Sequence, residues 1–224
     1  MRQPLRKRVA AEAFGTFFLL AAVVGSGIMA ERLAQGNTAL ALLANTAATG
    51  TALVALIISL APLSGAHFNP VVTLSFAWGF GFPWREVPFY VVAQLGGAIG
   101  GVMAANTMFG LPLVFVSHHP RTGWAQLFSE AVATLGLLGV ILGARRSQIV
   151  NVAIAVGAYI SAAYWFTAST SFANPAVSIA RCLSDTFAGI RPADVPGFIL
   201  AQIAGGVAAT LLLRWLMPID DADA

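Results

Sequence analysis

Long runs of apolar residues dominate the chain, and polar positions gather in the short segments between them. A transmembrane helix needs about 20 mainly apolar residues, and six runs reach that length. These runs are approximately 9–30, 39–62, 86–108, 124–144, 149–168 and 194–216. They do not alternate polar with apolar positions, as the shorter strands of a membrane β-barrel would. The pattern predicts an all-α integral membrane protein with six spanning helices.

The second half of the chain repeats motifs of the first half in the same order. The matched segments are AEAFGTFFLL (11–20) with SEAVATLGLL (129–138), HFNPVV (67–72) with FANPAV (172–177), and PFYVVAQ (88–94) with PGFILAQ (196–202). The order favours a duplication within a single domain of residues 1–224, with repeats at approximately 1–113 and 114–224. Because each half holds three spans, the second half must lie inverted in the membrane. Inverted repeats place a solute site near the bilayer midplane, which predicts a transport function.

Each half also carries an Asn-Pro pair in an apolar segment that is too short to span the membrane. Asn69 and Asn174 suit the N-cap of a helix, and the following proline suits its first turn. We therefore expect two half-helices, approximately 70–78 and 175–184, whose N-termini face each other in mid-membrane. Their dipoles repel cations, and the asparagine amides can donate hydrogen bonds to a passing oxygen. The predicted centre of a pore consists of Asn69, Pro70, Val71, Asn174, Pro175 and Ala176.

Composition supports the membrane assignment, and charge predicts the orientation. Hydrophobic residues make up 58% of the chain and charged residues 9%, against about 25% charged in a soluble domain. The net charge is +3. With six spans, eight basic residues fall on one face: Arg2, Arg6, Lys7, Arg8, Arg85, Arg145, Arg146 and Arg214. The positive-inside rule then predicts a multi-pass protein of the inner (plasma) membrane with both termini cytoplasmic. The cations form no patch that would predict binding to nucleic acid.

The Asn-Pro segments carry a family resemblance. SGAHFNPVVT (64–73) and SFANPAV (171–177) resemble the paired Asn-Pro-Ala signatures of the aquaporin, or major intrinsic protein, family, and the likeness covers the whole chain. Within the family the chain is similar to bacterial aquaglyceroporin-like channels of an arsenic-linked type. The resemblance implies a right-handed bundle of six helices and two half-helices, and a homotetramer in the lipid bilayer with one pore per subunit. Val71 replaces the alanine of the family and is expected to add bulk near the pore centre.

The resemblance also locates a selectivity filter. Family members have an outer constriction with an aromatic residue before the first Asn-Pro-Ala, a histidine or glycine and one further position before the second, and an arginine directly after the second. Counting from the two asparagines gives Thr49, Ala162, Ser171 and Val177. None of these is aromatic, histidine or arginine. The constriction is therefore expected to be wide and to pass water, glycerol and uncharged metalloid hydroxides such as arsenous acid.

Arg181 bears on the missing filter arginine. It follows Val177 by four residues, which is about one turn of the expected half-helix. Helical side chains lean toward the N-terminus, so its guanidinium can reach the place that Val177 leaves open. Alternatively, Arg181 extends into the outer vestibule and keeps its charge in water. The sequence leaves both interpretations open.

Two carboxylates, Glu12 and Glu130, lie within apolar runs, where a charge needs partners. The resemblance implies that each supports the backbone leading into a half-helix, so that glutamine is expected to replace either one; a proton relay is the alternative. His67 precedes Asn69 by two residues, at the cytoplasmic approach to the pore. It is expected to be a hydrogen-bonded wall residue, with titration near neutral pH as the alternative.

The main functional prediction is a passive channel for small uncharged solutes, and a water-selective channel is the alternative within the same class. A coupled transporter can also be built from inverted repeats, but the spans offer only Glu12 and Glu130 as titratable groups at mid-depth. An enzyme is not expected, because the chain has no HExxH motif and no nucleophile beside a base. His118 and His119 are adjacent and chelate poorly, so neither a metal site nor a cofactor is predicted.

Overall fold

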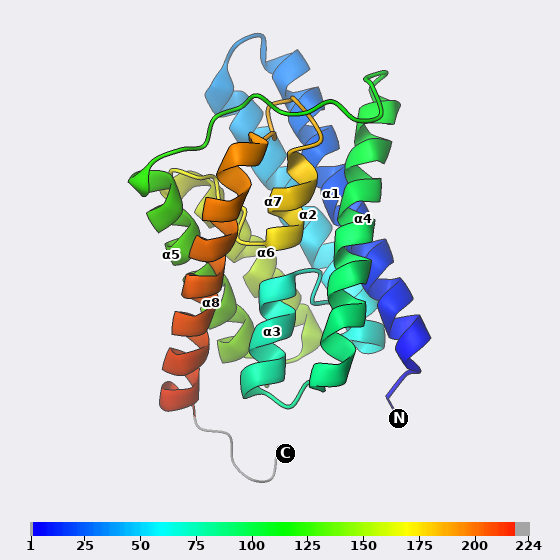
Figure 1. The fold of residues 1–224 in the computed structure, drawn as a ribbon, viewed down its shortest axis with the longest axis vertical. Coiled ribbons are helices and arrows are strands. Elements are labelled where there is room, and N and C mark those ends of the chain that lie inside the picture. The colour runs from blue at the N-terminus through cyan, green and yellow to red at the C-terminus, as the bar shows by residue number, and fades with distance from the viewer. Residues whose placement is uncertain (1, 218–224) are drawn as a thin grey trace.

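The computed structural model describes residues 2–217, which form a bundle of helices (Figure 1). Six of the helices in this part of the chain are long and apolar enough to cross a membrane. They are α1 (Leu5–Ala34), α2 (Thr38–Ser64), α4 (Val87–Met108), α5 (Trp124–Ala144), α6 (Ile149–Phe166) and α8 (Val195–Leu216). Short 3-10 helices at Trp84–Glu86 and Pro192–Asp194 lead into α4 and α8. The all-α membrane fold predicted from the hydrophobic runs is confirmed.

Two shorter helices complete the bundle: α3 (Pro70–Gly79) and α7 (Pro175–Arg181). They lie one above the other in the middle of the bundle, each within part of its height (Figure 1). Helix α7 ends at Arg181, before the expected residue 184. The amides of Cys182 and Leu183 bond the carbonyl groups three residues before them (3.4 and 3.0 Å), so the chain leaves the α-helix in a tighter turn. The carbonyl groups of the same two residues accept hydrogen bonds from the loop between α4 and α5 (2.9 and 3.2 Å).

Within each half of the chain the first long helix packs against the other two. Contacts between the halves are made by α2 with α6 and by the half-helices. Helix α1 packs against α2 and α4, α5 packs against α6 and α8, and α2 meets α6. Each half-helix contacts both α4 and α8, and the two half-helices contact each other. Gly97 and Gly101 allow α1 to approach α4 closely, because a Cβ at either glycine would lie 2.2 Å from the backbone oxygen of Ala13 or Phe17.

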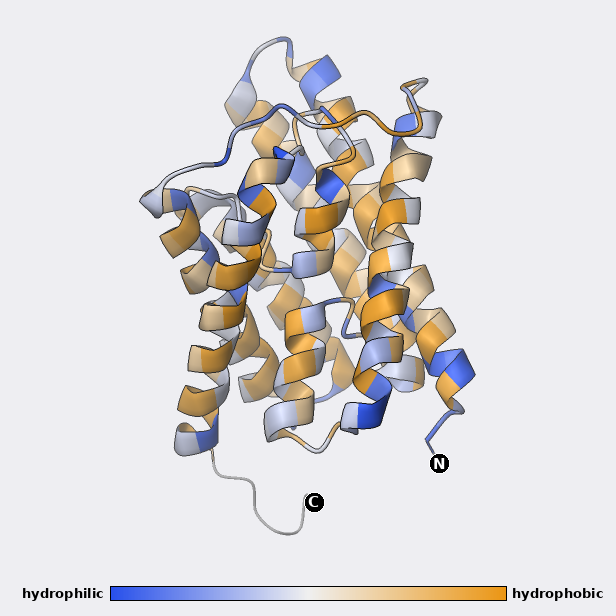
Figure 2. Cartoon of the chain, viewed as in Figure 1, coloured by the Kyte–Doolittle hydropathy of each residue, from blue (hydrophilic) through white to orange (hydrophobic). Residues whose placement is uncertain are grey.

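The outer surface of the bundle is apolar along the height of the helices, and hydrophilic residues gather at its two ends (Figure 2). Large apolar side chains that point outward include Phe14, Val92, Leu200 and Leu211. A soluble protein rarely exposes so much contiguous apolar surface, whereas a bilayer covers it. The chain is thus a multi-pass membrane protein with six spans.

Helix α1 begins and α8 ends at the same end of the bundle (Figure 1). We call this the inner end and the opposite one the outer end. The domain expected at residues 1–224 extends past the described part of the chain, because residues 1 and 218–224 lie outside it.

Candidate functional site

A cavity of about 320 Å³ lies along the middle of the bundle. Its walls come from one face of each surrounding helix, with positions four residues apart, as helical periodicity requires. Helix α2 supplies Thr49, Leu53 and Ile57, and α6 supplies Val156, Ile160 and Tyr164. The cavity reaches Arg145 and Ser147 toward the inner end and Arg181 toward the outer end. It therefore extends past the centre of the bundle in both directions.

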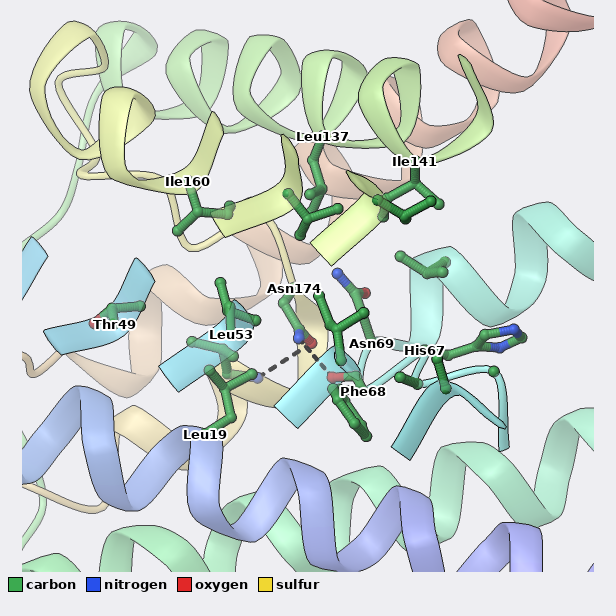
Figure 3. A pocket seen from close by; sticks show the side chains of 18 of the residues that line it. Leu19, Thr49, Leu53, His67, Phe68, Asn69, Leu137, Ile141, Ile160 and Asn174 are labelled. Atoms are coloured by element: carbon green, nitrogen blue, oxygen red, sulfur yellow. Dashed lines mark hydrogen bonds between the residues drawn. The ribbon is translucent and has the colours of Figure 1, made fainter. Parts of the chain in front are cut away.

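Asn69 and Asn174 lie side by side at the middle of this cavity (Figure 3). The Nδ2 of Asn69 donates to the backbone oxygen of Ala173 (2.7 Å), and the Nδ2 of Asn174 donates to that of Phe68 (2.8 Å). Each asparagine thus ties its own half-helix to the segment leading into the other. An amide NH2 has two hydrogens, so each retains one donor for another oxygen. Apolar side chains, among them Leu19 and Leu137, form the opposing walls (Figure 3).

The same two asparagines cap the half-helices. Both have extended backbone, and their Oδ1 atoms accept from the amide of Val71 (2.9 Å) and from the amide of Ala176 (2.9 Å). Pro70 and Pro175 occupy the first helical positions, where a missing N–H costs nothing.

Val71 differs from its expected place. It is buried and does not line the pore cavity, because it points from α3 toward α8, where a Cβ at Gly206 would lie 2.3 Å from its Cγ1. The expected bulk at the pore centre is therefore absent, and Val71 fills the contact between α3 and α8. Ala176 is likewise fully buried and outside the cavity lining.

Glu12 is fully buried and supports the segment that leads into α3. Its Oε1 accepts from the Ser64 hydroxyl (2.7 Å) and the His67 amide (3.0 Å), and its Oε2 accepts from the Phe68 amide (2.7 Å) and the Gln94 side chain (2.8 Å). Four donors thus converge on one carboxylate. Hydrogen bonds to an ionised acceptor are the strong ones, so the network offsets the cost of burying the charge.

Glu130 makes the corresponding contacts before α7. Its Oε1 accepts from the Phe172 amide (2.9 Å), and its Oε2 accepts from the Ala173 amide (2.9 Å) and the Gln202 side chain (2.6 Å). Both oxygens therefore act only as acceptors. The expectation that glutamine could replace either glutamate needs revision, because a side-chain NH2 would face backbone N–H donors.

We expect Glu130→Gln to lower the stability of the folded channel and reduce its solute flux. One charge-assisted acceptor is lost and one buried backbone N–H is left without a partner, which costs about 1–3 kcal/mol. Thermal unfolding in detergent and flux in liposomes measure both effects. Glu31→Gln is the matched control, because Glu31 is an exposed carboxylate on α1. Unchanged stability in Glu130→Gln would contradict the supporting role, and proton movement coupled to solute in the parent would favour a relay.

At the outer end, Thr49, Ser171 and Val177 line the cavity and are all buried in the protein. Tyr164 joins them from α6, and its hydroxyl donates to the Thr49 Oγ1 (3.3 Å). Among the described residues, none accepts or donates a hydrogen bond at the Ser171 hydroxyl. Phe172 also lines the cavity here, so this part combines two aromatic rings with small and medium-sized side chains. Counting along the sequence missed Tyr164.

Ala162 does not belong to this group, so its assignment to the constriction is wrong. It is exposed on the outer side of α6 and does not line the cavity. Two residues along a helix correspond to a rotation of about 200°, so Ala162 points away from the face that carries Ile160 and Tyr164. Counting back from Asn174 fails because an irregular segment, 167–174, separates α6 from α7.

Arg181 lines the cavity one turn beyond Val177 and is only 2% exposed. Its guanidinium carbon lies 3.5 Å from the centre of the Phe172 ring, and its Nε donates to the backbone oxygen of Ala188. No hydrogen bond within the described residues involves its two Nη atoms. Arg181 therefore does not extend into open vestibule. It places a buried cation with free donors beside the cavity.

His67 lines the inner half of the cavity, and its Nδ1 lies 3.1 Å from the Thr73 hydroxyl. Its ring stacks on Phe76 (centroids 5.0 Å apart) and contacts Phe82 and Tyr90 (5.2 and 5.4 Å). The histidine is thus a hydrogen-bonded wall residue within an aromatic cluster. Within residues 2–217, no three His, Cys, Asp or Glu side chains gather where they could hold a metal ion.

Six spanning helices around a cavity, with two asparagine-capped half-helices meeting at its middle, define a membrane channel. The family described as Major intrinsic protein matches residues 2–148 and 143–223. The chain therefore belongs to the major intrinsic protein family, and it is a channel for small neutral solutes, not an enzyme.

Individual relatives agree with this assignment. The chain is 54% identical over 213 residues to the aquaglyceroporin AqpS of Rhizobium meliloti, covering 95% of this chain and 91% of the relative. It is 32% identical to the probable aquaporin AqpM of Archaeoglobus fulgidus, covering 96% and 99%. The solved structure of the aquaglyceroporin from Plasmodium falciparum superposes with a TM-score of 0.75 over 96% of this chain and 97% of that one. At 22% identity, this last match speaks for the fold alone.

Proposed function

We propose that the channel has a wide outer constriction and passes water, glycerol and uncharged metalloid hydroxides such as arsenous acid. One observation carries the proposal. Thr49, Ser171 and Val177 line the outer part of the cavity, and the arginine beside it, Arg181, stands one turn beyond Val177. The relative named as an aquaglyceroporin, at 54% identity, supports glycerol as one of the solutes.

One side of the cavity is polar and the other is apolar, and each contributes to permeation. The Asn69 and Asn174 amides offer hydrogen bonds to solute hydroxyls, while the opposite walls are apolar. A neutral solute exchanges part of its hydration shell for these groups. A cation meets the positive ends of two half-helices and the Arg181 guanidinium, which repel it. Passive diffusion of uncharged molecules follows from this arrangement.

The assembly and orientation are part of the proposal. We propose inverted repeats at approximately 1–113 and 114–224, a homotetramer, and both termini on the cytoplasmic side of the inner (plasma) membrane. The clustering of basic residues at the inner end supports this orientation. The shared order of a long helix pair, a half-helix and a further long helix in each half supports the repeats.

Tyr164 favours a second candidate, a water-selective channel. Its ring and the Arg181 guanidinium both line the outer part of the cavity, so an aromatic residue and an arginine are present there after all. Both come from positions other than those counted from the family pattern. The two candidates differ in the size of the largest solute that passes.

Arg181→Ala tests which residue limits solute size. Because Arg181 is buried against the cavity, we expect Arg181→Ala to raise the ratio of glycerol to water permeability severalfold. The ratio is measured in liposomes. An increased leak of small cations should accompany the change. If a folded Arg181→Ala channel has the same ratio as the parent, Arg181 does not limit solute size and has only a structural role.

A further inference from the structure

The loop between α4 and α5 crosses the outer end of the bundle (Figure 1). Its Arg121 contacts the segments on both sides of α7. The Arg121 side chain donates to the backbone oxygens of Gly189 (2.8 Å) and Ser169 (3.1 Å) and to the Thr170 hydroxyl (3.4 Å). Its own amide donates to the Asp194 carboxylate (2.8 Å). Arg121 thus links this loop to the segment before α7 and the segment after it.

The loop is itself fixed to the chain that follows α7. The amide of His118 donates to the Asp185 carboxylate (2.8 Å), and the His118 ring lies 3.0 Å from the other oxygen. These contacts, the backbone amide first, hold the pKa of the Asp185 carboxyl below its usual value. The amide of Arg191 donates to the backbone oxygen of His119 (2.8 Å). Arg121 is therefore presented from a tethered loop.

Phe172 connects Arg121 to the pore. Its buried ring has the Arg181 guanidinium carbon 3.5 Å from its centre, that of Arg121 at 4.8 Å, and the Phe198 ring at 5.2 Å in an edge-on arrangement. Guanidinium groups stack on aromatic faces through cation–π attraction. Arg181 has one hydrogen bond to the described protein, at Nε, so the ring is the principal surface that orients it.

The backbone beside Phe172 also needs support. Thr170, Ser171 and Ala173 all have positive φ (59°, 51° and 49°), a conformation that costs non-glycine residues energy and persists only when the surroundings hold it. Glu130 holds the amides on the Ala173 side, and Arg121 holds the Ser169–Thr170 side. In the described part of the first half, no arginine donates to the matching segment before α3.

We propose that Arg121 is a positioning residue for solute selection: it fixes Phe172, and through this ring it sets the place of Arg181 in the constriction. Arg121 itself does not line the cavity. This inference rests on the proposed function only in that Arg181 limits solute size. It adds a residue from a distant loop to the group that determines which neutral solutes pass.

A double-mutant cycle tests the inference. Permeabilities to water, urea and glycerol are measured in liposomes for the parent, Arg121→Gln, Arg181→Ala and the double variant. If Arg121 acts through Arg181, Arg121→Gln raises the permeability ratio of the largest passing solute to water in the parent. The expected change is at least about twofold, the lower end of coupling between contacting residues. In the Arg181→Ala background the same substitution leaves the ratio unchanged. Equal effects in both backgrounds, or no effect in the parent, would overturn the inference.

Two further variants serve as a matched control and as a replacement if Arg121→Gln does not fold. Arg32→Gln is the matched control, because Arg32 also donates to a backbone oxygen, of Phe109 (3.0 Å), and lies over that ring (5.1 Å), but it is exposed and away from the cavity. It should leave every ratio unchanged. If Arg121→Gln does not fold, Arg121→Lys takes its place in the cycle, because an ammonium keeps the charge and loses the planar fork. The parent alone tests the proposed function: if it excludes glycerol, the solute assignment fails, and the cycle is still decided on urea and water.

Discussion

Asn174→Leu is expected to abolish solute flux. In the parent, the Asn174 amide donates to the Phe68 oxygen and its Oδ1 accepts from the Ala176 and Val177 amides (2.9 and 3.4 Å). Leucine removes all of these contacts. A buried carbonyl without a donor costs about 1–3 kcal/mol, and a lost N-cap costs about 1 kcal/mol. One of the two ties between the half-helices is lost at the same time, and a branched apolar group takes the place of one of the two central donors.

Asn37→Leu provides the control for this variant. Asn37 caps α2 at the surface, with its Oδ1 accepting from the Leu40 amide (3.1 Å), and it is far from the cavity lining. The Asn37→Leu channel should lose this helix cap and keep its solute flux. Swelling of liposomes that contain correctly folded protein is the measurement. Normal flux through a folded Asn174→Leu channel would show that the central asparagines are dispensable.

Val177→Arg is expected to reduce glycerol permeability at least about tenfold relative to water, which corresponds to about 1.4 kcal/mol. The new side chain adds bulk at a buried position of the cavity wall. It also places a second cation one turn from Arg181. Residues four apart on a helix are about 6 Å from each other, and two charges at that distance repel by about 3 kcal/mol at an effective dielectric constant near 20. One guanidinium must therefore move into the open cavity and narrow it.

Val177→Leu separates bulk from charge, because leucine fills space without adding a cation. We expect a smaller fall in the glycerol-to-water ratio from Val177→Leu than from Val177→Arg. If the ratio in a folded Val177→Arg channel equals that of the parent, Val177 lies outside the constriction, and the family alignment that located it is incorrect.

The six spans were predictable because apolar length and helix-capping chemistry are local properties of the sequence. The residues at which the helices begin and end were less predictable. Helix α1 begins at Leu5 and includes Arg6, Lys7 and Arg8, because an apolar run marks the membrane core and not the helix limits. Helix α7 ends at Arg181, and a distant loop bonds the carbonyl groups of the two residues that follow. Such a contact leaves no local signal.

The same distinction between local and long-range contacts explains which residues of the site were predicted correctly. Val177 and Arg181 share one half-helix with Asn174, so their spacing fixes their places relative to it. Ala162 belongs to another helix beyond an irregular segment, and counting placed it on the wrong face. Arg121 comes from a loop about fifty residues away in the chain, and only the folded structure shows its contact with Phe172.

Permeability of the parent channel to a size series of neutral solutes tests the central claim most directly. Purified protein in liposomes would be challenged with water, urea, glycerol and arsenous acid, with and without an ionophore that removes proton gradients. The structure predicts that all four pass, that glycerol and arsenous acid enter at rates well above those of empty liposomes, and that the ionophore changes none of them. Passage of water alone, or solute uptake that the ionophore abolishes, would contradict a wide and passive pore.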